Sequence, residues 1–221
     1  MTSDDAATPA GAQHEKLYAA ERPKAFFDAV VAIAMTLLIL PLMESVGEVA
    51  DASGTTLQWL TEHQWQLVSF VLSFVIIAMF WLNHQRLFAG VERVSTPLLW
   101  ISMGWLLTIV WLPVATALSS RMDDTDVWAK VIYIGSMILT ALAAMVQRVY
   151  LMRHPELHDL SAETLREGLG VDISMCVLFT VALVVAALVP QIGFYALFVM
   201  VLTGVVQRLL RRPLRRVGRA G

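Results

Sequence analysis

Long apolar stretches separated by short polar segments run through almost the whole chain. A helix needs about 20 mostly apolar residues to cross a bilayer. The chain contains six stretches near that length: 25–43, 65–82, 97–118, 127–149, 172–189 and 192–208. The last two share a charge-free block from Ile173 to Gln207, which is too long for one crossing at about 1.5 Å per residue. The pattern predicts an all-α, polytopic integral membrane protein with six transmembrane helices per subunit.

The composition agrees with this pattern and excludes several classes of protein. Hydrophobic residues make up 57% of the 221 residues and charged residues 15%, and mean hydropathy is +0.66. Soluble domains average about 45–50% apolar and 25% charged residues, so neither a soluble enzyme nor a nucleic-acid-binding protein is expected. The polar N-terminal segment does not resemble a cleavable signal peptide. The single cysteine, Cys176, excludes an intramolecular disulfide and a Cys-rich zinc site. No cofactor is expected.

The distribution of positive charge sets the expected orientation. Fourteen of the 16 Lys and Arg residues lie in the N-terminal arm, after the second and fourth spans, and in the C-terminal tail. The opposite side holds only Arg121 and Lys130. Because cytoplasmic loops carry an excess of Lys and Arg, we expect a cell-membrane protein with both termini in the cytoplasm. The expected parts are a cytoplasmic arm (1–24), a membrane domain (25–210) and a basic tail (211–221) that contacts anionic lipid.

Two of the connecting segments contain signals for short helices. On the outer side, Thr56 is expected to cap a short helix that leads toward Trp59 and Trp65, whose rings suit the membrane interface. On the inner side, Ser161 to Thr164 is expected to open a short amphipathic helix in the loop after the fourth span.

The first span differs from the others because polar residues interrupt its apolar run. On a helical wheel of about 100° per residue, one stripe lies within about 60° of Ile33. The stripe consists of Ala29, Ile33, Thr36, Leu37 and Leu40. Asp28 falls about 140° from Ile33, on another face. An ionisable residue inside a span usually faces protein or water, so Asp28 is expected to have a partner. Ordinary helix packing is the alternative explanation of the stripe.

Candidate partners of Asp28 lie at the cytoplasmic end of the second span. Trp81, Asn83 and His84 are possible hydrogen-bond donors there, and Arg22, just before the first span, is a possible ion-pair partner. One interpretation is that this cluster only locks two helices together. The other is that it controls gating or senses protons, since histidine titrates near neutral pH. The sequence alone leaves both interpretations open.

The first span carries a motif that resembles a known channel family. Arg22, Phe26 and Asp28, followed by A-I-A-M-T-L-L over 32–38, resemble the first-helix signature of the prokaryotic TMEM175-type potassium channels. That signature is roughly R-x-x-x-F-S-D followed by A-I-A-x-T-L-L. The chain departs from it at Phe27, where the family has a serine, and a phenylalanine side chain cannot form the hydrogen bonds of a serine.

The resemblance extends to later spans and implies an architecture. Trp81, His84 and Phe88 are similar to the W-x-x-H-x-x-x-F pattern of the family's second helix, and Pro113 matches a late proline in its third. The resemblance implies a homotetramer of six-helix subunits in membrane lipid, without a re-entrant pore loop. It also implies that the first helices of the four subunits line a central pore that conducts potassium.

The resemblance further assigns roles to individual residues. It places the pore constriction, a hydrophobic gate, at Ile33 and Leu40, and Leu37 shares the same stripe. It places the selectivity hydroxyl at Thr36, near which potassium is expected to bind transiently. The polar network behind the pore comprises Arg22, Asp28, Trp81 and His84. Acidic residues just beyond the first span are expected to concentrate cations at the outer mouth; these are Glu44, Glu48 and Asp51.

Other function classes find less support in the sequence. The five histidines are scattered and form no H-E-x-x-H motif, and neither Walker A nor G-x-S-x-G is present. His154 and His158 are four residues apart, but Pro155 disfavours a helix there, so a loop is expected rather than a metal site. A transporter often has helices broken near mid-span, whereas Pro41 and Pro113 are expected near span ends. A secondary transporter and a proton-permeable channel are the alternatives to a potassium channel; an intramembrane enzyme has the least support.

Overall fold

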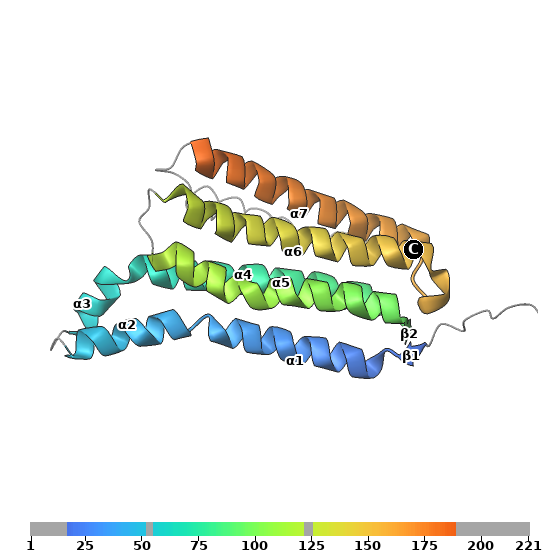
Figure 1. Cartoon of the computed structure of the whole chain (residues 1–221), viewed down its shortest axis with the longest axis horizontal. Coiled ribbons are helices and arrows are strands. Elements are labelled where there is room, and N and C mark those ends of the chain that lie inside the picture. Colours follow the sequence, from blue (N-terminus) through green and yellow to red (C-terminus); the bar gives the residue numbers. More distant parts are fainter. Residues whose placement is uncertain (1–16, 52–54, 122–125, 189–221) are drawn as a thin grey trace, which may run out of the picture.

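The structure is a computed structural model that describes residues 17–51, 55–121 and 126–188, with only the backbone described for 48–51. Its elements, in chain order, are β1 (Tyr18–Ala19), α1 (Glu21–Leu37), α2 (Leu40–Asp51), α3 (Thr56–Glu62), α4 (Gln64–Phe88), β2 (Arg93–Val94), α5 (Thr96–Arg121), α6 (Val127–Arg153), the 3-10 helix η1 (Pro155–Leu157) and α7 (Ala162–Leu188). Figure 1 shows the long helices side by side, with α1 and α2 end to end along one edge and α7 along the other.

Five helical segments of the described residues are long and apolar enough to cross a membrane. They are Glu21–Gly47, Gln64–Phe88, Thr96–Arg121, Val127–Arg153 and Ala162–Leu188. A helix of this length extends about 40 Å, which exceeds the hydrocarbon thickness of about 30 Å. The protein is therefore a multi-pass membrane protein. The predicted sixth span (192–208) and the basic tail (211–221) lie outside the described residues.

Of the two predicted short helices, the outer one is present and the inner one is not a separate helix. The outer one exists as α3, but its N-cap is Thr55, whose Oγ1 accepts the N–H of Gln58 at 3.3 Å, and not Thr56. The prediction of a separate inner helix at Ser161 is wrong, because these residues form the start of α7. The Ser161 hydroxyl accepts the N–H of Thr164 at 3.2 Å and so caps α7 directly.

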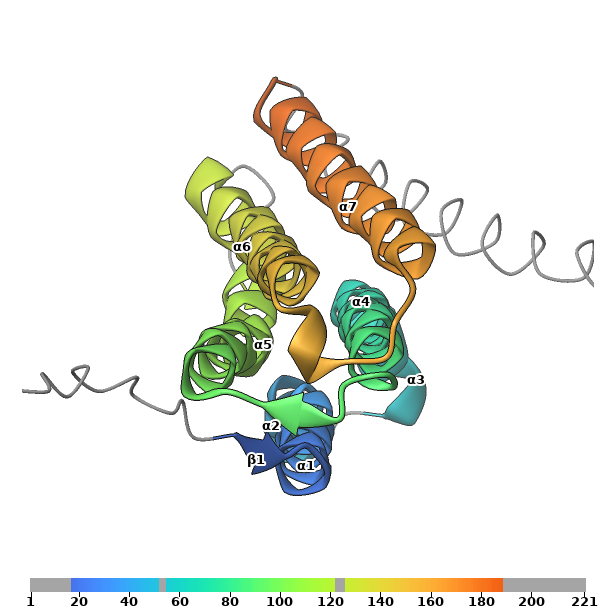
Figure 2. The same ribbon diagram turned by 90° about the vertical axis from the view of Figure 1, so that its right-hand side faces the viewer.

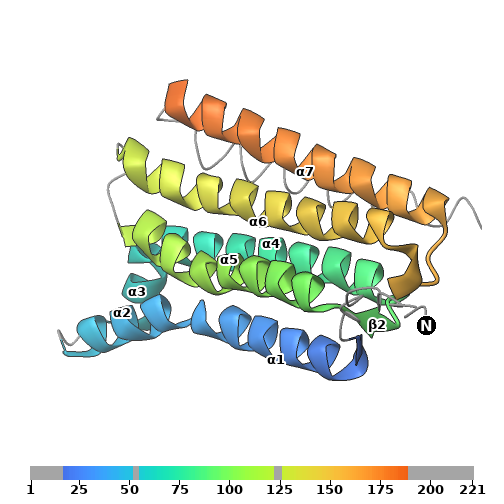
Figure 3. The same cartoon turned by 45° about the vertical axis from the view of Figure 1, so that its right-hand side comes forward.

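A break divides the first membrane helix into α1 and α2 at Leu38 and Ile39 (Figures 1 and 3). Pro41 follows the break; a proline has no N–H to donate, and its ring clashes with the carbonyl four residues earlier. After the break, the N–H of Leu42 bonds to the carbonyl of Ile39 at 3.1 Å. Pro41 lies near the end of the apolar segment at Gly47, as expected, whereas the break just before it was not expected.

The helices pack as a bundle in which α6 lies between α5 and α7, and α1 lies against α4 and α5. The end-on view in Figure 2 shows α1 and α2 at one margin of the bundle and α7 at the opposite margin. One side of α1 is consequently covered by its own subunit, and the other side faces outward.

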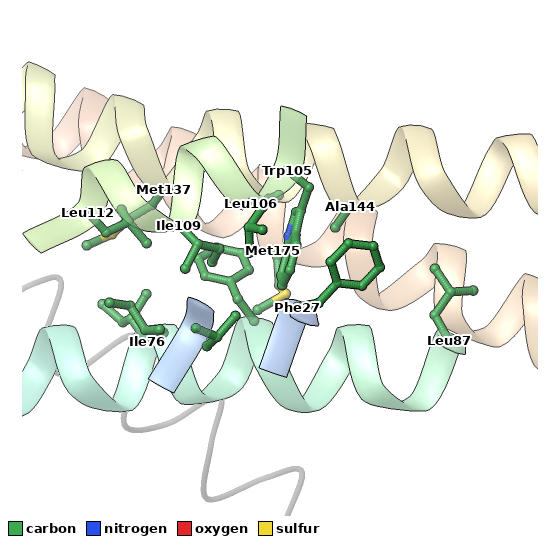
Figure 4. Packing of buried hydrophobic residues seen from close by; sticks show 14 of the residues in the cluster. Phe27, Ile76, Leu87, Trp105, Leu106, Ile109, Leu112, Met137, Ala144 and Met175 are labelled. Atoms are coloured by element: carbon green, nitrogen blue, oxygen red, sulfur yellow. The ribbon is translucent and has the colours of Figure 1, made fainter. Parts of the chain in front are cut away.

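Large side chains from several helices fill the interior of the bundle. Phe27 of α1, Trp105 and Ile109 of α5, Met137 of α6 and Met175 of α7 are buried together (Figure 4). Lipid tails are as apolar as these side chains, so close packing, rather than exclusion of water, holds such helices together in a membrane.

A small ribbon at one end of the bundle holds the start of α1. In the two-stranded antiparallel sheet, Tyr18 of β1 lies opposite Val94 of β2. The N–H of Ala20 bonds to the carbonyl of Glu92 at 3.2 Å, and the N–H of Glu92 bonds to the carbonyl of Leu157 at 3.0 Å. The residues just before α1 are thereby tied to the loop before α5 and to η1.

Candidate functional site

The first membrane helix has two different faces. Its inner face packs against the subunit through Phe27, Val31, Ala34 and Leu38. Its outer face leaves large apolar side chains uncovered, and Ile33 is 58% exposed. The whole predicted stripe lies on the outer face: Ala29, Ile33, Thr36, Leu37 and Leu40 are all exposed. Each subunit therefore presents an apolar strip that carries one hydroxyl and that its own helices do not cover.

The hydroxyl of Thr36 is oriented by its own helix. Thr36 Oγ1 donates to the carbonyl of Ile33 at 2.7 Å, a local bond that Thr often forms inside helices. The hydroxyl hydrogen is used in this bond, but the oxygen keeps acceptor lone pairs. An exposed oxygen of this kind can accept a hydrogen bond from water or ligate a cation.

Asp28 links α1 to α4 on a different face of α1 from the stripe. Trp81 Nε1 donates to Asp28 Oδ1 at 3.0 Å, and the side-chain amide of Gln85 donates to the same oxygen. The Trp81 contact matches the sequence prediction, whereas Gln85 was not predicted. Residues four apart share a helix face, so Gln85 was recognisable from its position one turn after Trp81. In the described part of the chain, no ion pair joins Arg22 to Asp28.

His84 faces the interior of the subunit, away from Asp28. Its ring stacks on Trp105 and Phe88, with centroids 4.1 Å and 4.2 Å away, and meets the edge of Phe27 at 5.6 Å. Among the described residues, no hydrogen-bond partner reaches His84 Nε2. Phe27 stands at the motif position where the family has a serine. His84 therefore contacts three aromatic rings, those of Phe27, Phe88 and Trp105, and no serine hydroxyl at that position. The predicted hydrogen bond between His84 and Asp28 is therefore absent among these residues.

Comparison with known proteins identifies the family to which these motifs belong. Residues 22–113 match the family described as "Endosomal/lysosomal potassium channel TMEM175". A potassium channel of Streptomyces collinus is 33% identical over 143 residues, which cover 62% of this chain and 67% of that protein. The chain belongs to the TMEM175 family. The family match includes α1, α4 and most of α5.

Two further comparisons extend this result to other TMEM175 proteins. A potassium channel of Chamaesiphon minutus is 32% identical over 98 residues. These residues cover 44% of this chain and 47% of that protein. The crystal structure of a lysosomal potassium-selective channel TMEM175 homolog from Chamaesiphon minutus superposes with a TM-score of 0.67 at 22% identity. The superposition covers 85% of this chain and 96% of that one, so the two chains share a fold.

A buried polar cluster of this TMEM175 chain lies away from the stripe and was not predicted. Asp172 accepts from Arg148 Nε at 2.5 Å and from Asn83 Nδ2 at 2.7 Å. Arg148 also donates to Asn83 Oδ1 at 3.3 Å, and all three side chains are buried. A Cβ on Gly168 would lie 2.0 Å from the guanidinium. The cluster joins α4, α6 and α7, and Arg148, one of the positive charges expected in the loop after the fourth span, lies inside α6 instead.

A second buried cluster consists mainly of hydroxyl groups. Ser73 Oγ lies 2.7 Å from Tyr133 Oη and 3.0 Å from Thr116 Oγ1, so it connects α4 with α5 and α6. Lys130, one turn before Tyr133, is also buried. Lys130 belongs to the first turn of α6, within the predicted fourth span.

Only one of the three acidic residues expected at the outer end of the pore can be placed by its side chain. Glu44 forms an exposed ion pair with Arg121 at the end of α5, so its charge is balanced within the subunit. The side chains of Glu48 and Asp51 lie outside the described ones. Of the three acidic residues expected to concentrate cations at the outer end of the pore, only Glu44 has a described side chain, and Arg121 neutralises its charge.

The histidines of the loop after α6 serve its structure. His154 stacks on Tyr150 with ring centroids 4.0 Å apart. His158 Nδ1 accepts the N–H of Leu160 at 3.1 Å, and its Nε2 lies 3.0 Å from the carbonyl of Leu151. The described part of the chain holds no group of three or more His, Cys, Asp or Glu residues that could bind a metal.

Proposed function

We propose that the protein is a passive, potassium-permeable cation channel. In this proposal four identical subunits surround a central pore, and the exposed stripe of each first membrane helix lines it. The observation that carries the proposal is the uncovered outer face of α1, where apolar side chains flank the exposed hydroxyl of Thr36. Membership of a family that includes potassium channels supports the same function.

The stripe contains the two kinds of group that such a pore needs. Rings of Ile33, Leu37 and Leu40 form a narrow apolar constriction, which closes a pore by excluding water. A ring of Thr36 hydroxyls supplies oxygen atoms to a partly dehydrated cation, so potassium binds there only in passing. No cofactor takes part in this passive permeation.

The polar residues behind the stripe set the position of the pore helix. Asp28 and Trp81 attach α1 to α4 through a 3.0 Å hydrogen bond. Arg22 lies in the first turn of α1. His84 lies on the buried side of α4. In the proposed function this region controls how closely α1 approaches the pore axis.

The proposed channel lies in the cell membrane with both termini in the cytoplasm. The end that carries β1 and β2 then faces the cytoplasm, as the excess of Lys and Arg predicts. The basic tail (211–221) contacts anionic lipid headgroups there.

Ion flux from liposomes tests the proposed function. Purified protein is reconstituted with potassium inside and sodium outside, and potassium efflux is followed as a function of the gradient. A channel gives efflux that needs no coupled ion, whereas a strict requirement for a second ion identifies a transporter. A relative from Danio rerio, 22% identical over 142 residues, is named a proton channel, so a pH dye inside the liposomes measures proton flux in parallel.

Two substitutions test the assignment of the stripe. Ile33→Ser is expected to raise potassium flux, because a polar ring keeps the constriction wet. Thr36→Val keeps the shape of the side chain but removes the hydroxyl, and is expected to lower the preference for potassium over sodium. Leu107→Ser on α5 is the control, since Leu107 is 71% exposed but outside the stripe. Equal effects of Ile33→Ser and Leu107→Ser would contradict the assignment.

A further inference from the structure

The buried cluster of Ser73, Thr116 and Tyr133 fixes how three helices face one another in the half of the bundle away from β1 and β2. Ser73 of α4 lies 2.7 Å from Tyr133 of α6 and 3.0 Å from Thr116 of α5. In Figure 1, α4 and α6 run from the end that carries α3 toward the end that carries β1 and β2, whereas α5 runs the opposite way. The next helical turn toward the α3 end is therefore earlier in α4 and α6 and later in α5.

At that next turn each of the three helices contributes another buried polar side chain. Ser69 of α4 and Lys130 of α6 come four and three residues before members of the cluster, and Ser119 of α5 comes three residues after one. Residues three or four apart lie on the same face of a helix. Ser69, Ser119 and Lys130 are 7%, 5% and 4% exposed. Two hydroxyl groups and one ammonium group therefore meet at one level between α4, α5 and α6.

The two serine hydroxyls at this level are not used by the protein around them. A serine inside a helix often donates to a carbonyl of the preceding turn, as Ser102 and Ser136 do at 2.8 Å and 2.6 Å. In the part of the chain that the structure describes, Ser69 Oγ and Ser119 Oγ are buried and have no hydrogen-bond partner. Buried hydroxyls are nearly always paired, with protein or with a bound molecule. Both O–H groups are therefore available to a ligand.

The charge of Lys130 selects the kind of ligand. An ammonium group has three N–H donors and no acceptor, so the other contact that Lys130 makes in the protein leaves donors over. A buried charge requires an opposite charge beside it, which an anion supplies and a water molecule does not, and a metal cation is repelled. Gln66, one turn further out on α4, has a buried amide oxygen without a partner among the described residues; a half-turn of this amide presents its NH₂ group to the same level.

We propose that Ser69, Ser119 and Lys130 form a binding site for one small monovalent anion, such as chloride, between α4, α5 and α6. A hydroxyl reorients about one bond and the lysine stem is flexible, so the three donors can converge on one ion. The bound ion joins three helices and stabilises the folded subunit. The site is separate from the stripe of α1, and the inference does not depend on the proposed channel function.

Thermal unfolding of the purified full-length protein in detergent tests the site. The unfolding temperature is measured along a series in which potassium chloride replaces potassium gluconate at constant ionic strength, since gluconate is too large to enter. Chloride at a few times its dissociation constant is expected to raise the unfolding temperature by about 2–4 °C, and the rise is expected to saturate. Equal unfolding temperatures throughout the series overturn the proposal and leave water as the partner of the two serines.

Substitutions separate a specific site from a general effect of the salt. Ser119→Ala and Lys130→Gln each remove one proposed ligand group and are expected to abolish most of the chloride-dependent rise. Ser102→Ala is the matched control, because Ser102 is a buried serine of the same helix whose hydroxyl bonds to the carbonyl of Leu98. Arg121→Gln controls for an exposed positive charge at the same end of the bundle. A rise that survives in both site variants, or that falls equally in the controls, overturns the proposal.

Bromide locates the ion directly and keeps the proposal testable if Lys130→Gln does not fold. In crystals of the wild type grown in potassium bromide, an anomalous difference peak is expected beside Ser69, Ser119 and Lys130. The peak is expected to disappear in Ser119→Ala and to persist in Ser102→Ala. Absence of a peak between α4, α5 and α6, or peaks only at the protein surface, overturns the proposal.

Discussion

Replacing Asp172 with Asn is expected to destabilise the protein strongly, because it leaves the charge of Arg148 buried without a counter-charge. Asp172 accepts bonds from Arg148 at 2.5 Å and from Asn83 at 2.7 Å. The Arg148 and Asp172 side chains are only 5% and 1% exposed, so water cannot replace the lost carboxylate. Removing one partner of a buried ion pair costs about 3–5 kcal/mol.

The chain offers a matched control in its exposed ion pair. The side chains of Glu44 and Arg121 are 63% and 47% exposed, and surface pairs contribute about 0–1 kcal/mol. Glu44→Gln is therefore expected to change the free energy of unfolding much less than Asp172→Asn. The double variant Arg148→Met with Asp172→Leu removes both buried charges and is expected to recover much of the loss, since apolar replacements of a buried pair are often neutral.

The measurement is equilibrium unfolding of the purified protein in mixed micelles of a mild detergent and sodium dodecyl sulfate, followed by circular dichroism. The free energy of unfolding is compared among wild type, Asp172→Asn, Glu44→Gln and the double variant. The reasoning fails if Asp172→Asn loses no more stability than Glu44→Gln. It also fails if the double variant is less stable than Asp172→Asn, because the unpaired charge of Arg148 would then not be the cause.

Three other substitutions address other contacts of the bundle. Phe27→Ala is expected to cost about 3–5 kcal/mol in the same unfolding assay, because it empties a buried aromatic site; a cost below that of Glu44→Gln would contradict this packing role. Tyr133→Phe removes the 2.7 Å contact with Ser73 and is expected to cost about 0.6–2 kcal/mol, the range for hydrogen bonds between membrane helices; no loss would show that the contact is energetically neutral. Trp81→Phe removes one donor to Asp28 and is expected to change the open probability in single-channel recordings at an unchanged permeability ratio. A changed ratio would place Trp81 in the permeation path.

Features that depend on local sequence were predictable. The length of an apolar run decides whether a helix can cross the bilayer, so five predicted spans have counterparts among the described helices. The helical repeat decides which residues share a face, so the stripe that includes Ile33 and Thr36 was assigned to one face before any contact was known. The contact between Asp28 and Trp81 was predictable because α1 and α4 are consecutive membrane helices that meet at one end.

Features that depend on the packing of distant segments were not predictable. Asn83, Arg148 and Asp172 come from three helices, and no local spacing indicates that their side chains meet. The break at Pro41 was missed for a different reason. The apolar run in the sequence ends near Met43, which suggested that the proline marked the end of the span, whereas α2 continues to Asp51 through residues of mixed polarity.

Exposure alone does not separate a pore-lining face from a lipid-facing one, because the side chains of both can be apolar. Leu107 of α5 is exposed as Ile33 of α1 is, and either side chain is compatible with lipid. The stripe of α1 differs from the exposed residues beside Leu107 because it carries the hydroxyl of Thr36 among its apolar side chains. The variants Thr36→Val and Leu107→Ser therefore decide which face meets the ion, since only the first removes a group that can ligate a cation.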